Sequence, residues 1–144
     1  MLISSMNLIN KYFSDKSDKG GNPYKDHLIY VMNHVDTTEE KVVGLLHDII
    51  EDTSVTEGQL LQYGIPKKLV DTIVILTKRS DETYDKYIKR IIESKNQIAI
   101  NVKLADLENN MDFSRLKIIT SKDLVRKTKY KKAYAELIQY KKPL

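Results

Sequence analysis

The run Leu45-Leu46-His47-Asp48-Ile49-Ile50-Glu51-Asp52-Thr53 places an imidazole and three carboxylates within six residues of an otherwise apolar segment. On an α-helix, at about 100° per residue, these ionisable side chains fall on one arc and the apolar ones on the other. Gly44 lies within the polar arc, where its missing side chain would let a backbone or a ligand approach closely. Adjacent carboxylates on a mostly buried helix persist only if they are paired, protonated or bound to a cation. We therefore expect this run to bind a cation; the alternative is a solvated acidic face on an amphipathic helix.

Composition limits the classes of protein to which this 144-residue chain can belong. The length fits one domain with a sizeable core, and the few Gly (5) and Pro (3) favour helices joined by short turns. With no cysteine in the chain, disulfides, thiolate metal ligands and cysteine nucleophiles are excluded. The chain shows neither a signal sequence nor an apolar stretch of membrane-spanning length. We predict an all-α, single-domain protein that is soluble, located in the cytoplasm and without a membrane partner.

Charge is unevenly distributed along the chain. Residues 115–144 carry 10 Lys or Arg and 2 acids, a net charge of +8, whereas residues 1–114 carry 14 and 18, a net charge of −4. A basic segment can bind nucleic acid or another anionic ligand. Within the tail, however, five apolar or aromatic residues recur at helical spacing: Tyr130, Ala133, Tyr134, Leu137 and Ile138. This stripe favours a docked amphipathic helix over residues 121–142 with a solvated basic face, and it weighs against nucleic-acid binding.

Apolar spacing and capping signals predict the other helices. Six expected ranges are 2–13, 24–35, 56–63, 66–77, 84–95 and 97–111. Thr37 and Glu40 are spaced as a capping box that opens a further helix, the one with the His-Asp run. Ser121 is the expected N-cap of the basic helix. Tyr84 and Tyr87 are expected in the core rather than in a platform for stacking bases.

Four residues spread over three predicted helices form a candidate metal site: His27, His47, Asp48 and Asp106. This mixed nitrogen and oxygen set suits Mn²⁺, Fe²⁺, Zn²⁺ or a similar ion rather than Ca²⁺. Asn110 follows Asp106 by one helical turn, so the two side chains should project together. His34 lacks such neighbours, and we expect it to be a satisfied core histidine.

Three motifs carry a resemblance to a known family: "NPYKDH", "LLHDIIEDT" and "VKLADLENN". They resemble the HD-domain superfamily of metal-dependent phosphohydrolases, whose pattern is a histidine, an adjacent His-Asp pair and a later aspartate. More narrowly, they look like the hydrolase half of the bifunctional Rel/SpoT alarmone enzymes of the stringent response and their small free-standing relatives. There the motifs read close to "GEPYxxH", "LLHDxxEDT" and "KLADRxHN". The resemblance runs over about residues 19–115, the core of a single HD-type helical bundle that we expect to span residues 1–144.

The resemblance implies a reaction and a role for each matching residue. The implied reaction is hydrolysis of the 3′-pyrophosphate of guanosine tetra- or pentaphosphate (ppGpp or pppGpp). One Mn²⁺, or another divalent transition metal, would be bound by His27, His47, Asp48 and Asp106. The attacking water would be positioned and deprotonated by Glu51 and Asp52. The nucleotide would be contacted by Lys19, Tyr24, Lys103 and Asn110.

The sequence departs from the family pattern where substrate is chosen. The family commonly places an arginine against the guanine base just before the first motif, whereas this chain has Asp18-Lys19. His27 is followed by Leu28 where proline is usual, and Leu107-Glu108-Asn109 replaces a run that usually contains Arg and His. Only 20 residues separate the first two histidines of the ligand set, fewer than in the bifunctional enzymes. The metal ligands are untouched, so the hydrolytic centre is better supported than the guanine nucleotide.

Two alternatives follow from these departures. The first is the same metal chemistry on another nucleotide, such as a nucleoside 5′-monophosphate or a phosphorylated nicotinamide dinucleotide (NADPH phosphatase type). The second is a degenerate HD domain that binds a nucleotide or nucleic acid without catalysis. The retained Glu51-Asp52 pair argues against the second, because a pure binding module needs no proton acceptor beside its metal. The expected partner is a small nucleotide substrate, and the sequence carries no signal for an oligomeric state.

Overall fold

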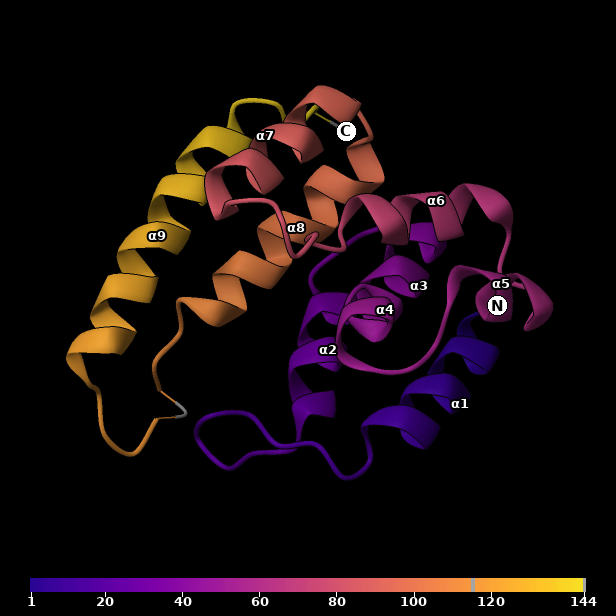
Figure 1. The fold of residues 1–144 in the computed structure, drawn as a ribbon, viewed down its shortest axis with the longest axis horizontal. Helices are drawn as coiled ribbons and strands as arrows, with labels where there is room; N and C mark the ends of the chain where they lie inside the picture. The colour runs from indigo at the N-terminus through magenta and orange to yellow at the C-terminus, as the bar shows by residue number, and fades with distance from the viewer. Residues whose placement is uncertain (115, 144) are drawn as a thin grey trace.

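The computed structural model describes residues 1–114 and 116–143 and is all-α, as expected (Figure 1). The helices in chain order are α1 (Leu2–Phe13), α2 (Tyr24–Asn33), α3 (Thr38–Leu46), α4 (Ile49–Asp52), α5 (Glu57–Gln62), α6 (Lys67–Ile75), α7 (Tyr84–Ser94), α8 (Gln97–Asn110) and α9 (Ser121–Ile138). Among the described helices, none is both long and apolar enough to cross a membrane. Arg115 and Leu144, which end the predicted core and the predicted domain, lie outside the described residues.

One hydrophobic core joins helices from both ends of the chain. α3 packs against α1, α2, α6 and α8, and α8 also packs against α9. Burying a large apolar side chain stabilises the fold by about 1.5–3 kcal/mol. Fully buried side chains come from α1, α2, α3, α6 and α8: Phe13, Leu28, Leu45, Ile73 and Ile100 are examples. The long helix α8 therefore runs through the middle of the bundle, with α9 on one side and α2 and α3 on the other (Figure 1).

Gly44 allows α3 to approach α2 closely. A Cβ at this position would lie 3.1 Å from Cγ1 of Val31 and 3.4 Å from the backbone nitrogen of Met32. The contact with Val31 is tight enough that its side chain would have to move by a few tenths of an ångström. The expectation of a close approach at Gly44 is confirmed, and the neighbour is the α2 backbone.

The helix with the His-Asp run differs from the prediction. The Thr37–Glu40 capping box opens α3 as expected, but α3 ends at Leu46 and α4 begins at Ile49, so His47 and Asp48 lie in a turn between them. In this turn His47 Nδ1 lies 2.6 Å from the carbonyl oxygen of Gly44, an acceptor that a continuous helix uses for a backbone N–H. The prediction of one uninterrupted ionisable arc is therefore wrong.

The basic terminal helix docks on the core as predicted, with two differences at its ends. α9 ends at Ile138 rather than at residue 142, and its N-cap is Thr120 rather than Ser121. Thr120 is preferred because its side chain accepts from the Asp123 backbone while the Asp123 carboxylate accepts from the Thr120 N–H, which completes a capping box. Ala133 and Leu137 are buried against the core. The ends of the other helices lie within about two residues of their predicted positions.

Candidate active site

Four predicted metal ligands from three parts of the chain converge beside the core. α2 supplies His27, the turn between α3 and α4 supplies His47 and Asp48, and α8 supplies Asp106. His27 Nε2 lies 2.8 Å from Asp106 Oδ1. His47 Nε2 lies 3.2 Å from Asp48 Oδ2 and 3.5 Å from Asp106 Oδ1. His27, His47 and Asp106 are each at most 4% exposed, so these atoms face one another away from bulk water.

Hydrogen bonds from the Nδ1 atoms orient both imidazoles. The Gly44 carbonyl oxygen can only accept, so His47 Nδ1 carries a proton. His27 Nδ1 lies 2.7 Å from Asn109 Oδ1, which also accepts. With Nδ1 as the donor of the ring, each Nε2 atom is directed at carboxylate oxygens and has no hydrogen-bond partner within residues 1–114 and 116–143. Nitrogen and carboxylate oxygen atoms that face one another this closely need a cation between them, either a proton or a metal ion, so the arrangement suits a cation site.

Neighbouring charges keep the site carboxylates ionised. Burial raises the pKa of Asp106, but Lys103 and His47 outweigh this effect and hold that pKa well below its usual range. Burial lowers the pKa of His47, but Asp48 and Asp106 raise it well above its usual range. These charges favour a proton on His47 where no other cation is bound. A divalent ion would displace this proton on binding.

Three of the predicted substrate-binding residues contact the ligand carboxylates. The Tyr24 hydroxyl donates to Asp48 Oδ2 at 2.6 Å, and Lys103 Nζ donates to Asp106 Oδ2 at 2.8 Å. Asn110 Nδ2 donates to Asp106 Oδ1 at 3.1 Å, which confirms the projection expected from their one-turn separation. These bonds orient the carboxylates of the two predicted ligands, as outer groups of metal sites commonly do. Contact of the three residues with a nucleotide stays a prediction.

A cavity of about 370 Å³, here called the reaction cavity, opens beside the ligand set and includes the predicted catalytic pair. Glu51 Oε1 accepts a hydrogen bond from the Lys78 backbone N–H at 2.9 Å, which holds this carboxylate at the wall. Burial, Asp48 and Glu51 raise the pKa of Asp52 to about 6. A carboxyl group with a pKa near the working pH suits general-base catalysis.

Cationic and aromatic residues also line the reaction cavity, and sequence reasoning did not place them in the site. They are Lys78, Tyr84, Tyr87, Lys129 and Tyr130. Two of these residues belong to α9, whose cations were predicted to face solvent. The apolar stripe of α9 signalled that the helix docks, but no signal in the sequence indicated which cations would turn toward the ligand set.

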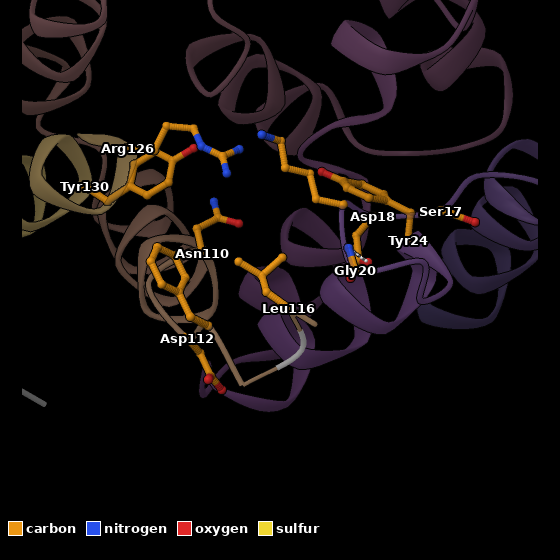
Figure 2. Close-up of a pocket in the computed structure, with 11 residues that line it drawn as sticks. Ser17, Asp18, Gly20, Tyr24, Asn110, Asp112, Leu116, Arg126 and Tyr130 are labelled. Carbon is orange, nitrogen blue, oxygen red and sulfur yellow. Dashed lines mark hydrogen bonds between the residues drawn. The ribbon is translucent and has the colours of Figure 1, made fainter. Parts of the chain in front are cut away.

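A second cavity of about 300 Å³, here called the outer cavity, adjoins the reaction cavity and shares Tyr24, Asn110 and Tyr130 with it. Figure 2 shows Arg126 and Tyr130 of α9 on one side of it and Tyr24 on the other. Lys19 also lines this cavity, so the four predicted substrate-binding residues are distributed between the two cavities. Arg126 is a further candidate that sequence reasoning missed.

Two residues that the sequence singled out have structural roles. Asp18 Oδ1 accepts from the backbone N–H groups of Gly20 at 2.9 Å and Asn22 at 3.0 Å, so this carboxylate orders the loop before α2. His34 is exposed rather than in the core; it stacks on Tyr30 with 3.7 Å between ring centroids, and its Nδ1 bonds the Tyr30 carbonyl. Its placement in the core was therefore wrong, although its ring is satisfied.

Comparison with known proteins supports the fold. No family model matches the sequence, and no curated protein sequence matches it. The structure is similar to a solved structure of a metazoan ortholog of SpoT that hydrolyzes ppGpp and plays a role in starvation responses, with a TM-score of 0.76 and 18% identity. The match covers 96% of this chain and 85% of that chain. It confirms, at the level of the fold, the Rel/SpoT-type resemblance that the motifs indicated.

Proposed function

We propose that this protein is a metal-dependent phosphohydrolase that removes the 3′-pyrophosphate from guanosine tetra- or pentaphosphate. The observation that carries the proposal is the convergence of two imidazoles and two carboxylates with both Nε2 atoms directed at carboxylate oxygens. The similarity in fold to a ppGpp hydrolase supports the same chemistry. The reaction cavity has a volume within the range of small-molecule sites.

The donor set fits a divalent transition metal. Imidazole nitrogen and carboxylate oxygen together suit Mn²⁺, Fe²⁺ and Zn²⁺, and we propose Mn²⁺. His27, His47, Asp48 and Asp106 would hold it. A bound divalent cation polarises a phosphoryl oxygen and lowers the pKa of a bound water.

Residues of the chain itself account for the proton and for the position of the substrate. Glu51 or Asp52 accepts a proton from the attacking water while the water oxygen bonds to the proximal phosphorus of the 3′-diphosphate. The bond between that phosphorus and O3′ breaks, and O3′ takes up the proton from the carboxyl group. Pyrophosphate and a nucleotide with a free 3′-hydroxyl are released. Tyr24 and Asn110 line both cavities, so the ribose would cross from one cavity to the other beside them.

The outer cavity is proposed to bind the nucleoside. Arg126 supplies there the planar cation that position 18 lacks, and stacking of a guanidinium on a purine contributes on the order of 1 kcal/mol. Tyr24 and Tyr130 add aromatic surface, and Lys19 adds a second cation for phosphate or base. A nucleotide substrate of this kind implies a cytoplasmic enzyme.

A second candidate function is the same hydrolysis of another phosphorylated nucleotide, including a 5′-monophosphate or a phosphorylated nicotinamide dinucleotide. The observation that favours it is the engagement of Asp18 with loop N–H groups, at the position where the family commonly has a guanine-contacting arginine. Base selection then depends on α9, where a guanidinium stacks on any purine. A binding module without catalysis is disfavoured by the Glu51 and Asp52 carboxylates in the reaction cavity.

The test is a nucleotide panel with identification of the products. The Mn²⁺-loaded protein should release pyrophosphate from guanosine 3′-diphosphates, and chelation followed by Mn²⁺ re-addition should abolish and restore the release. Release of inorganic phosphate from 5′-monophosphates or dinucleotides, with 3′-diphosphates untouched, would favour the second candidate. Tight nucleotide binding with no turnover across metals would identify a binding module.

A further inference from the structure

The Tyr84 hydroxyl is buried, and it has no hydrogen-bond partner in the described parts of the chain. Tyr84 is the first residue of α7 and lines the reaction cavity. Tyr87, one turn later on the same helix, differs from Tyr84 in this respect. Its buried hydroxyl has an acceptor within the protein, because it donates to the Leu76 carbonyl oxygen at 2.6 Å. A buried donor left unsatisfied costs free energy, so an unpartnered hydroxyl at a cavity wall indicates an acceptor that is supplied by a ligand.

The surroundings of Tyr84 indicate that this acceptor is anionic. Lys129 Nζ lies 4.5 Å from the centroid of the Tyr84 ring, and Lys103 Nζ lies 5.8 Å from it. Lys103 is paired with Asp106. The pKa of Lys129 is lowered by partial desolvation of its ammonium group and by the positive charges of Arg126 and Lys103, as expected where cations gather without enough neighbouring anions.

The lining of the reaction cavity therefore carries groups of two kinds. The ligand set with Glu51 and Asp52 supplies carboxylates, whereas Tyr84 and Lys129 supply an unpartnered hydroxyl and an ammonium group. Lys103 bonds Asp106 and lies 5.8 Å from the Tyr84 ring centroid, so the hydroxyl-bearing ring is a neighbour of the ligand set. Two phosphates in sequence would use both kinds of group, with the proximal one at the ligand set and the distal one at the hydroxyl and ammonium groups.

We propose that the Tyr84 hydroxyl and the Lys129 ammonium bind the distal phosphate of a diphosphate ester and thereby select diphosphate over monophosphate substrates. The inference rests on the proposed function, in which the proximal phosphorus is attacked, and it deepens that function by assigning a specificity-determining residue. Tyr84 donates one hydrogen bond to a non-bridging oxygen, and Lys129 supplies the counter-charge.

The binding test uses the full chain loaded with Mn²⁺ and titrated by calorimetry with inorganic pyrophosphate and, separately, with orthophosphate. Tyr84→Phe should weaken pyrophosphate binding by about tenfold to a hundredfold, the range for a hydrogen bond to a charged group. Orthophosphate binding should change by less than about twofold. Tyr134→Phe is the matched control, because its hydroxyl bonds Glu108 away from either cavity, and it should change neither affinity. Elemental analysis after each titration checks that the metal is retained.

A second readout separates ligand binding from a structural role. Because the hydroxyl is unpartnered in the ligand-free protein, Tyr84→Phe should raise the ligand-free Tm, by about 2–4 °C for a domain of this size. A structural hydroxyl would give the opposite sign. Lys129 is exposed, so the Lys129→Met protein should fold. This substitution should weaken the binding of pyrophosphate more than the binding of orthophosphate. It replaces Tyr84→Phe in the binding test if Tyr84→Phe does not fold.

The outcomes distinguish the subsite from the reaction. Unchanged pyrophosphate binding in a folded Tyr84→Phe protein, or equal weakening of both anions, overturns the subsite. Tyr84-dependent pyrophosphate binding in a protein that hydrolyses no nucleotide 3′-diphosphate would support the subsite and overturn the proposed function.

Discussion

The reaction cavity and the outer cavity adjoin one another but are built in different ways. The ligand set of the first comes from α2, the α3–α4 turn and α8, and its imidazoles are at most 3% exposed. The second is lined by the loop before α2 and by α9, and there the Lys19 and Arg126 side chains are 60% and 31% exposed. Groups held by core packing resist displacement, whereas exposed groups can be exchanged at little cost to the fold. We infer that the chemistry is fixed by the core and that the choice of nucleotide is set at the surface.

The largest effect is expected at the ligand set, where Asp48→Ala should abolish both Mn²⁺ binding and activity. The fold should survive, because the Asp48 side chain is 17% exposed and its truncation opens no apolar cavity. Elemental analysis, turnover and circular dichroism measure the three properties. Asp71→Ala, which removes a carboxylate from an exposed pair with Lys67, is the matched control and should keep all three. Stoichiometric metal in folded Asp48→Ala protein would remove Asp48 from the ligand set.

The second-largest effect is expected at Glu51 and Asp52, the predicted catalytic pair in the lining of the reaction cavity. Glu51→Gln should keep the metal and lower kcat by about 10²- to 10⁴-fold, the usual contribution of a positioned proton acceptor. Steady-state kinetics with a metal determination on the same sample gives both quantities. If Glu51→Gln instead lost the metal and regained full turnover when metal was added back, Glu51 would be a metal ligand rather than a proton acceptor.

The pKa of the Asp52 carboxyl predicts how the turnover rate depends on pH. Its pKa is raised to about 6 by burial, Asp48 and Glu51. A base acts when deprotonated, so kcat should fall as pH drops through this pKa; a bound cation would move the fall to lower pH. The pH profile of kcat in Asp52→Asn should lose this acid limb. If kcat of Asp52→Asn still fell at low pH, the fall would come from the protonation of another group.

A smaller effect is expected at the outer cavity. Arg126→Ala should raise KM by roughly tenfold with little change in kcat, because stacking on a base is felt about equally in the ground and transition states. Arg126→Lys should recover little of the loss, since an ammonium lacks the planar face. Because Arg126 also contacts Asp123, the helix content of each variant is compared by circular dichroism. An unchanged KM in Arg126→Ala would mean that Arg126 does not contribute to nucleotide binding. It would contradict the inference that the outer cavity selects the nucleotide.

The smallest effect is expected at the α6–α7 turn, which carries Lys78 to the reaction cavity. Arg90 bonds Glu82 there and also donates to the carbonyl oxygens of Ile75 and Thr77. The bond from Arg90 lowers the Glu82 pKa to about 2, against the opposing effect of burial. A depressed carboxyl pKa adds stability that is present above the unfolded value, about 4.3, and is lost as pH falls toward 2.

Glu82→Gln should therefore lower the free energy of unfolding by roughly 1 kcal/mol at pH 7 and by progressively less toward pH 2. Urea denaturation at several pH values measures the difference. Glu93→Gln, which breaks an exposed pair with Lys89, should show almost no deficit at any pH. A deficit in Glu82→Gln that stays constant from pH 7 to pH 3 would show that ionisation of this carboxyl is not its source.

The sequence by itself determined the helices and predicted which residues would meet at the candidate metal site. Apolar periodicity and capping boxes are local signals, so the Thr37 and Thr56 caps and most helix ends were predicted closely. The break at His47-Asp48 was missed, because a side-chain bond to the Gly44 carbonyl competes with the helical one and leaves no trace in periodicity. The ligand types and their order were also readable, since the motifs are contiguous and the helices bring them together.

Only the tertiary structure decided what surrounds the ligand set. Lys19 and Arg126 line one cavity although they are more than a hundred positions apart, and Lys129 faces the reaction cavity although its helix reads as a basic solvent face. These positions depend on the rotation and depth at which α9 packs on α7 and α8. Packing of this kind is settled by the fit of many side chains from distant segments at once, which local sequence patterns do not encode.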